Sequence, residues 1–318
     1  MRQKKNRRTL LWSAIAIVFL IAASITIERP ALGAGEQYTP LSVKTPDGLT
    51  IRAQVWGNAN GPEILLIHGF SQSYLSWIKQ TGGDFPRAFR IVTYDFRGHG
   101  GSDKPLEAKY YQDDKAWADE VAAVIQAANL KHPVVVAWSY GGRVIGNYLK
   151  YYGDSHLAGI NLVDIRTKAA EPAWDGDVIR KTRAPMISAD IATNIAGTKE
   201  FVRGVTAAPL SREDFELALA YNMVVPIEVR AALRGGRNAG VDFTEVFKIL
   251  RVPVLVTHGA KDNLIKLEAA RYTASIVPGA KLSIYENVGH APFLEEPVRF
   301  NRELATFVMK ATARRSSY

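Results

Sequence analysis

Six short runs of consecutive apolar residues are spaced along the body of the chain, and segments with helical periodicity lie between them. Each run is unbroken rather than alternating, which is typical of strands that helices cover on both faces. Strands that alternate with helices predict a mostly parallel sheet with right-handed crossovers. The predicted strands are 64–67, 91–94, 134–138, 160–165, 254–257 and 282–285, and the predicted helices are 114–128, 142–152, 267–276 and 297–311.

Two segments depart from this rhythm. Residues 41–57 alternate on both sides of Asp47-Gly48, a pair that favours the turn of a β-hairpin. Residues 167–247 contain no buried-strand run and are instead typical of several short helices with apolar faces. We therefore predict an α/β core of residues 38–166 and 248–318, with residues 167–247 inserted into it as a helical cap.

The first 33 residues differ from the rest in charge and hydropathy. They hold six basic residues against one acidic residue, and an apolar stretch runs from Leu10 to Ile27. This order is typical of an export signal, and the small residues up to Gly33 fit a cleavage site. The stretch also reaches about eighteen residues, near the lower length for a membrane anchor. Both alternatives predict an exported protein, periplasmic or extracellular, which residues 10–27 hold at the membrane if they are not cleaved.

The formal net charge of +9 does not predict a nucleic-acid partner. Five of these charges come from residues 1–33, and the other four are spread without a basic stripe or interleaved aromatic residues. The chain has no cysteine, which excludes thiol nucleophiles and thiolate metal sites. Because no metal-ligand spacing and no glycine-rich phosphate loop occurs, we expect no metal, no cofactor and a small-molecule substrate.

The most specific chemical signal is Ser139, in the segment Ala137-Trp138-Ser139-Tyr140-Gly141. This segment joins a predicted strand to a predicted helix, and a serine between small residues at such a turn is typical of a nucleophile elbow. The turn is so tight that the positions two before and two after the serine must be small. The hydroxyl then stands clear of the sheet.

A serine hydroxyl is a weak nucleophile at neutral pH, so it needs an adjacent base, and the base needs an orienting acid. In an α/β sheet these partners are expected where strands reach their carboxyl ends. His290 follows the strand 282–285, and Asp262 follows the strand 254–257. Asp164, at the end of the strand 160–165, is a competing candidate for the acid, and we favour Asp262.

Five segments, in this order, resemble the α/β-hydrolase superfamily, in particular its serine-nucleophile branch of esterases and cofactor-free haloperoxidases. These segments are His68-Gly69-Phe70, Tyr94 to Ser102, the serine elbow, Gly259 to Asp262, and Gly289-His290-Ala291-Pro292. The resemblance extends over residues 42–312 and implies an α/β-hydrolase fold with a helical cap.

The resemblance also implies roles for individual residues. Ser139, His290 and Asp262 would form a catalytic triad, and the backbone N–H groups of Phe70 and Tyr140 would form an oxyanion hole. Two further expectations concern neighbouring side chains. Trp138 and His99 should pack beside the site, with pocket lining as the alternative, and Asp95 should pair with Arg97.

Serine at the elbow argues against the dehalogenase and epoxide-hydrolase relatives, which use aspartate there. The leading hypothesis is a serine hydrolase that cleaves a small to medium carboxylic ester through an acyl-enzyme. The apolar content of the cap favours an apolar substrate over a charged one. Lactone, amide or C–C bond cleavage and perhydrolysis are alternatives on the same triad. A non-catalytic ligand-binding protein is the alternative of another class.

Overall fold

The computed structural model describes residues 38–315. The predicted export signal or membrane anchor, residues 1–33, lies outside the described residues. Within the described part of the chain, no helix combines the length and the apolar character needed to cross a bilayer. Export and membrane association therefore stay predictions.

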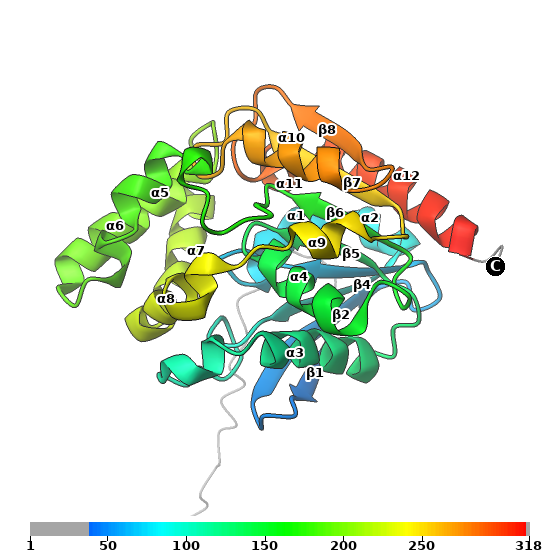
Figure 1. Cartoon of the computed structure of the whole chain (residues 1–318), viewed down its shortest axis with the longest axis horizontal. Helices are drawn as coiled ribbons and strands as arrows, with labels where there is room; N and C mark the ends of the chain where they lie inside the picture. The colour runs from blue at the N-terminus through cyan, green and yellow to red at the C-terminus, as the bar shows by residue number, and fades with distance from the viewer. Residues whose placement is uncertain (1–37, 316–318) are drawn as a thin grey trace, which may run out of the picture. The chain divides into compact units, whose positions relative to one another are not determined.

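One eight-stranded sheet forms the centre of the described chain (Figure 1). The strand order is β1-β2-β4-β3-β5-β6-β7-β8; β2 pairs antiparallel with β1 and β4, and all other neighbours are parallel. The predicted fold class is confirmed. The strands are β1 (Thr39–Lys44), β2 (Thr50–Gly57), β3 (Glu63–Ile67), β4 (Arg90–Asp95), β5 (Val134–Trp138), β6 (Gly159–Val163), β7 (Val254–Gly259) and β8 (Lys281–Tyr285).

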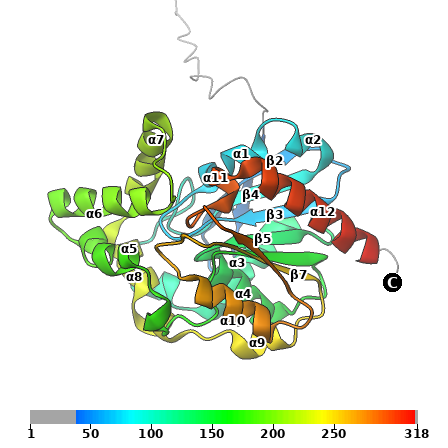
Figure 2. The same cartoon turned by 90° about the horizontal axis from the view of Figure 1, so that it is seen from above.

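Helices cover both faces of this sheet (Figure 2). Helices α1, α11 and α12 lie on one face, and α3, α4, α9 and α10 lie on the other. In α4 the buried residues Val144, Ile145, Tyr148 and Leu149 recur every three or four positions, so they form one apolar face. The helices are α1 (Ile78–Thr81), α2 (Phe85–Ala88), α3 (Asp114–Ala127), α4 (Gly141–Tyr152), α9 (Thr244–Lys248), α10 (Leu267–Ile276), α11 (Pro292–Glu295) and α12 (Pro297–Arg315).

Four more helices lie between β6 and β7, at one side of the sheet in both views (Figures 1 and 2). We call this segment, residues 167–247, the cap; its limits as a domain stay a prediction. The chain enters and leaves the cap side by side, because Phe243 N–H donates to Thr167 O and Ala169 N–H donates to Val241 O. The helices are α5 (Asp177–Thr182), α6 (Ile191–Gly204), α7 (Arg212–Met223) and α8 (Ile227–Arg234).

Candidate active site

Ser139 occupies a strained turn between β5 and α4. Its φ of 53° lies in the left-handed region that residues with a side chain rarely adopt. The turn is held by hydrogen bonds from Ser139 N–H to Val163 O and from Gly142 N–H to Ser139 O, both 2.9 Å. A Cβ at Gly141 would lie only 2.6 Å from Ile67 O, so this position requires glycine. The tight turn expected from the sequence is therefore present.

His290 and Asp262 lie in the loops after β8 and β7, and their side chains are in contact. His290 Nδ1 and Asp262 Oδ2 are 2.6 Å apart, while Asp262 Oδ1 accepts hydrogen bonds from Leu264 N–H (2.7 Å) and Ile265 N–H (3.0 Å). Burial would raise the pKa of Asp262, but the charge and hydrogen bond of His290 hold it below its usual value. An ionised carboxylate thus fixes one ring nitrogen of His290, Nδ1, and sets the orientation of the imidazole.

Asp164, the competing acid, lies immediately beside this pair. Its Oδ1 accepts a hydrogen bond from Gly259 N–H (2.9 Å) and lies 3.3 Å from His258 Nδ1. Burial, together with the charge of Asp262, raises the pKa of Asp164 well above its usual value. A neutral Asp164 stabilises an imidazolium less than an ionised carboxylate does, so Asp262 is better suited to orient His290.

Asp164, Asp262 and His290 also form the one group among the described residues whose spacing could hold a metal ion. One ligand atom from each lies within 4.8 Å of the others. However, the Nδ1 of His290 already shares a short hydrogen bond with Asp262. A metal would have to replace that bond, so the donor set fits proton transfer better than metal binding.

The backbone N–H groups of Phe70 and Tyr140 donate to no other residue of the described chain. The loop that carries Phe70 passes close to the elbow, since a Cβ at Gly69 would lie 3.1 Å from Ser139 Cβ. The next residue, Ser71, has a φ of 61° and donates its N–H to His99 Nε2 (3.1 Å). Two unpaired donors beside a serine could bind an oxygen that gains negative charge.

His99 holds the loop that carries Phe70 and Ser71, and its side chain is not exposed to solvent. It is fully buried, and its Nδ1 lies 3.0 Å from Arg97 O, so Nε2 is the acceptor for Ser71. Burial, with a contribution from His68, keeps the pKa of His99 well below its usual value, so the ring is neutral. Trp138 is likewise buried, and its Nε1–H donates to His290 O (2.7 Å).

Ser139 lines a cavity of about 170 Å³ between the elbow and the cap. This is small beside the roughly 300–1,000 Å³ of typical ligand sites. Neither Trp138 nor His99 is among the residues that line this cavity, so the structure favours packing beside the site over the alternative of pocket lining. The wall combines apolar side chains with four arginines: Arg143, Arg166, Arg183 and Arg234.

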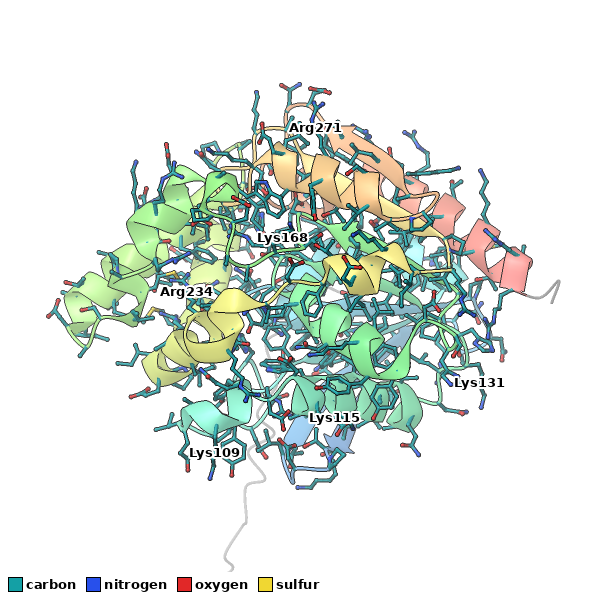
Figure 3. All side chains as sticks on the ribbon, viewed as in Figure 1. Lys109, Lys115, Lys131, Lys168, Arg234 and Arg271 are labelled. Atoms are coloured by element: carbon teal, nitrogen blue, oxygen red, sulfur yellow. The ribbon has the colours of Figure 1, made fainter. Side chains whose placement is uncertain are left out.

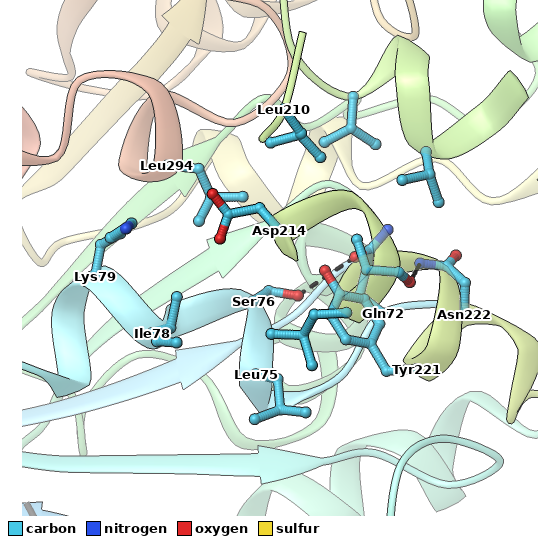
Figure 4. A pocket seen from close by; sticks show the side chains of 14 residues that line it. Gln72, Leu75, Ser76, Ile78, Lys79, Leu210, Asp214, Tyr221, Asn222 and Leu294 are labelled. Carbon is cyan, nitrogen blue, oxygen red and sulfur yellow. Dashed lines mark hydrogen bonds between the residues drawn. The ribbon is translucent and has the colours of Figure 1, made fainter. Parts of the chain in front are cut away.

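A second hollow, of about 60 Å³, lies between the 3-10 helix η1 (Tyr74–Trp77) and α7 (Figure 4). Its lining is mainly apolar, and Ser76 Oγ donates to Gln72 Oε1 (3.3 Å) at its wall. None of the three candidate catalytic side chains lines it. The cavity at Ser139 is therefore the candidate substrate site.

The loops that carry the acid and the base are fastened to the cap through backbone hydrogen bonds. His290 N–H donates to Val205 O (2.8 Å), and Gly176 N–H donates to Leu264 O (2.9 Å). Glu295 Oε1 accepts from Gly289 N–H and its Oε2 from Ala207 N–H, both 2.8 Å. Sequence reasoning missed Glu295, because no local pattern indicates that its carboxylate joins Gly289, next to His290, to Ala207 of the cap.

The expected ion pair between Asp95 and Arg97 is wrong. Arg97 is fully buried and binds Glu120 and Asp47, each at 2.7 Å. Asp95 instead accepts hydrogen bonds from Tyr74 N–H (2.8 Å) and a second backbone N–H, that of Gly101 (2.9 Å). Glu120 of α3 and Asp47 of the β1–β2 hairpin neutralise the guanidinium, so it does not need Asp95. Asp95 instead joins the segment at Tyr74 to the loop after β4.

Comparisons with known proteins agree with this arrangement. The profile described as "Alpha/beta hydrolase family" matches residues 64–303. The chain is 28% identical to the "Bifunctional esterase/perhydrolase DCH" of Acinetobacter calcoaceticus over 84% of this chain and 98% of the relative. An aryl-esterase candidate from Burkholderia cenocepacia has 36% identity and a TM-score of 0.82, over 86% of this chain and 100% of that one. Esterase RhEst1 from Rhodococcus sp. ECU1013 has 31% identity and a TM-score of 0.78, over 85% and 98%.

Proposed function

Because the chain belongs to the alpha/beta hydrolase family and is an α/β-fold hydrolase, we propose that it hydrolyses small carboxylic esters through an acyl-enzyme formed on Ser139. The observation that carries the proposal is the 2.6 Å contact between His290 and Asp262 at the sheet edge that also bears the strained serine. The esterase names of several relatives support the same reaction class.

In the proposed reaction Ser139 Oγ attacks the acyl carbon, and its proton passes to His290 Nε2. Asp262 stabilises the imidazolium through Nδ1. The N–H groups of Phe70 and Tyr140 donate to the substrate oxygen as it becomes negative, a contribution of about 3–4 kcal/mol for each donor. His290 then protonates the leaving alcohol. Water, deprotonated by the same imidazole, cleaves the acyl-enzyme and releases the carboxylic acid.

Covalent labelling tests the nucleophile. A p-nitrophenyl ester should be turned over, and an activated organophosphate should add one phosphoryl group to Ser139, as read by intact mass and peptide mapping. Ser139→Ala should abolish labelling and turnover, whereas Ser275→Ala, at an exposed helical serine, should retain both. Labelling elsewhere, or full activity in Ser139→Ala, would contradict the proposal. Ligand binding without turnover would favour a binding protein instead.

Perhydrolysis is a second candidate on the same site. The similarity to a bifunctional esterase/perhydrolase and, at 27% identity, to a non-heme chloroperoxidase of Streptomyces lividans supports it. In this reaction hydrogen peroxide takes the place of water and releases a peracid from the acyl-enzyme. Peracid formation that requires both an ester and Ser139 would favour it.

Export is a further part of the proposal and rests on the sequence of residues 1–33 alone. Amino-terminal sequencing of protein purified from its native host distinguishes the alternatives. A start at Ala34 would indicate a cleaved signal, and retention of the whole segment in a membrane fraction would indicate an anchor. Full-length protein in the cytosolic fraction would contradict both.

A further inference from the structure

The cavity at Ser139 carries an excess of positive charge. Four arginines line it, and no aspartate or glutamate of the described chain does. Arg166 and Arg183 are partly neutralised by Asp175, just outside the lining, at 2.6 and 3.4 Å. The charges that need explanation are therefore those of Arg143 and Arg234.

Arg234, the last residue of the cap helix α8, is labelled among the cap helices in Figure 3 and is half-buried. No carboxylate of the described residues lies within ion-pair distance of it. Its guanidinium donates to Arg183 O (3.0 Å) and, weakly, to Met186 Sδ (3.6 Å). Burial, together with the charges of Arg183 and Arg230, lowers the pKa of Arg234 to about 9, so it is still a cation at neutral pH.

Arg143 is similarly placed, one helical turn beyond the elbow serine. It too lacks a carboxylate partner among the described residues. Its Nη1 makes long hydrogen bonds to Leu233 O (3.4 Å) and Tyr140 Oη (3.5 Å). A guanidinium has five N–H donors, so most of the donors of Arg143 are available to a ligand.

Both guanidinium groups lie next to the residues that flank the reacting centre. Arg234 stacks over the ring of Phe70, with its Cζ 4.1 Å from the ring centroid. Arg143 lies over the ring of Tyr140, at 5.0 Å. The backbone N–H groups of Phe70 and Tyr140 are the proposed oxyanion donors. An anion held by the two arginines would therefore lie within the same small cavity as the scissile ester.

We propose that Arg143 and Arg234 form a subsite for an anionic group of the substrate, a carboxylate or a phosphate, so that the enzyme prefers half-esters with a free acidic end. Unpaired cationic groups in a partly dry cavity are costly, and charge-assisted hydrogen bonds from an oxyanion relieve that cost. The apolar lining, which includes Phe201 and Phe243, would contact the carbon chain between the two ends. The inference rests on the proposed esterase function.

This proposal revises the expectation of an apolar substrate. The cap does supply apolar contacts, as its composition indicated, and Phe201, Phe243 and Leu233 reach the cavity. Composition did not reveal that arginines from α4, α8 and two connecting segments converge on the same space. The substrate class is therefore amphiphilic, with an apolar middle and an anionic end.

The test compares monomethyl glutarate with dimethyl glutarate at pH 7.5. Wild-type enzyme should show the higher kcat/KM with the monomethyl ester. In Arg143→Gln/Arg234→Gln the ratio of the two kcat/KM values should fall about 10- to 100-fold, mainly through KM. Arg212→Gln, at an exposed arginine of α7, is the matched control and should keep the wild-type ratio. A preference for the diester, or a ratio unchanged in the double variant, would overturn the subsite.

Two further measurements show whether the subsite prefers a carboxylate or a phosphate, and whether a variant has lost activity only because it is misfolded. A matched ester with a phosphate end, compared with the carboxylate half-ester, shows which group the subsite prefers, and rejection of both would overturn it. Arg234→Lys keeps the positive charge but loses the planar guanidinium that can donate two parallel hydrogen bonds. It should therefore keep more of the wild-type ratio of the two kcat/KM values than the double variant does. A misfolded variant would lose activity on every substrate, and its melting curve would identify it.

Binding separates this inference from the proposed reaction. Glutarate should bind Ser139→Ala in calorimetry, and the two arginine substitutions made in that background should weaken binding about 10-fold or more. If wild-type enzyme hydrolyses neither ester while glutarate still binds through the arginines, the ester-hydrolase proposal fails and the subsite stands. If esters are cleaved but glutarate does not bind, the subsite fails alone.

Discussion

The α/β core and the cap each bury a whole arginine side chain, but they treat its charge differently. In the core, Arg97 binds two carboxylates at 2.7 Å and lies over the ring of Trp117, 5.4 Å from the centroid. In the cap, Arg230 donates only to neutral oxygens, among them Met186 O (3.2 Å). Its Nε has no partner in the described chain.

The pKa values follow this difference. Burial opposes the charge of Arg97, yet Glu120 and Asp47 together raise its pKa, whereas burial lowers the pKa of Arg230 to about 10. The core thus neutralises its buried charge internally, and the cap does not. Arg234, one turn beyond Arg230 on α8, extends that unneutralised charge to the wall of the cavity. The comparison shows that the buried arginine of the core has carboxylate partners, whereas the buried arginine of the cap has only neutral ones.

The largest expected effect comes from removing the charge of Asp262, which pairs with His290 in the candidate active site. Asp262→Asn should lower kcat by roughly 10⁴-fold, because the wrong tautomer of His290 is then favoured. Asp164→Asn should change kcat by less than about tenfold, since the raised pKa already keeps that group neutral. Steady-state kinetics on a p-nitrophenyl ester measures both, with circular dichroism as the folding control. The reverse ranking would assign the acid to Asp164.

The next effect concerns stability and uses one substitution at both buried arginines. Arg97→Met leaves Glu120 and Asp47 without their partner and should lower the free energy of unfolding by about 3–5 kcal/mol. Arg230→Met leaves only neutral acceptors unpaired and should cost roughly 1–2 kcal/mol. Urea unfolding followed by fluorescence measures the two variants side by side. Equal losses would show that the two regions do not differ in this way.

The last effect, which is modest over the pH range of the measurement, is acid sensitivity through buried histidines; these lie in the core, because residues 167–247 contain no histidine. Burial lowers the pKa of His68 to about 3, against 6.5 when unfolded. The unfolded chain therefore binds the proton first, so this stabilisation is complete above pH 6.5 and is lost as the pH falls toward 3. The loss is about 1.4 kcal/mol per pH unit for one such histidine.

Unfolding free energies measured between pH 7 and pH 5 test this sign. The slope against pH should be smaller in His68→Asn than in wild-type protein. His132→Asn, at an exposed histidine, should keep the wild-type slope. Identical slopes in all three proteins would mean that His68 does not couple folding to protons.

The sheet could be predicted from the sequence because most residues of the parallel strands are apolar, although β6 contains Asn161 and β8 contains Ser283. The residues at which strands end were less predictable where the backbone turns sharply. The run 160–165 overestimates β6, which ends at Val163, because Asp164 adopts a φ of 47° and turns the chain out of the sheet. Apolar character continues past that point, so hydropathy alone does not reveal the end of the strand.

The candidate triad residues could be predicted because each lies in a loop directly after a strand, and parallel strands bring such loops to one edge. The arginine subsite could not, since its members come from separate parts of the chain that only the folded cap brings together. One signal did exist. Arg143 lies four residues after Ser139, a spacing that on a helix brings a side chain back to the turn that begins it.

The antiparallel neck of the cap, where Thr167 and Ala169 pair with Phe243 and Val241, has an evolutionary consequence. Because the chain departs from the sheet and returns to it at adjacent points, an insertion there can be lengthened, shortened or exchanged without shifting any strand. Variation of the cap at this junction can therefore change the part of the cavity wall that Arg183 and Arg234 supply, while the sheet that precedes Ser139 keeps its register. Arg143, on α4, would stay with the sheet, so an exchanged cap inherits one half of the arginine pair from the core.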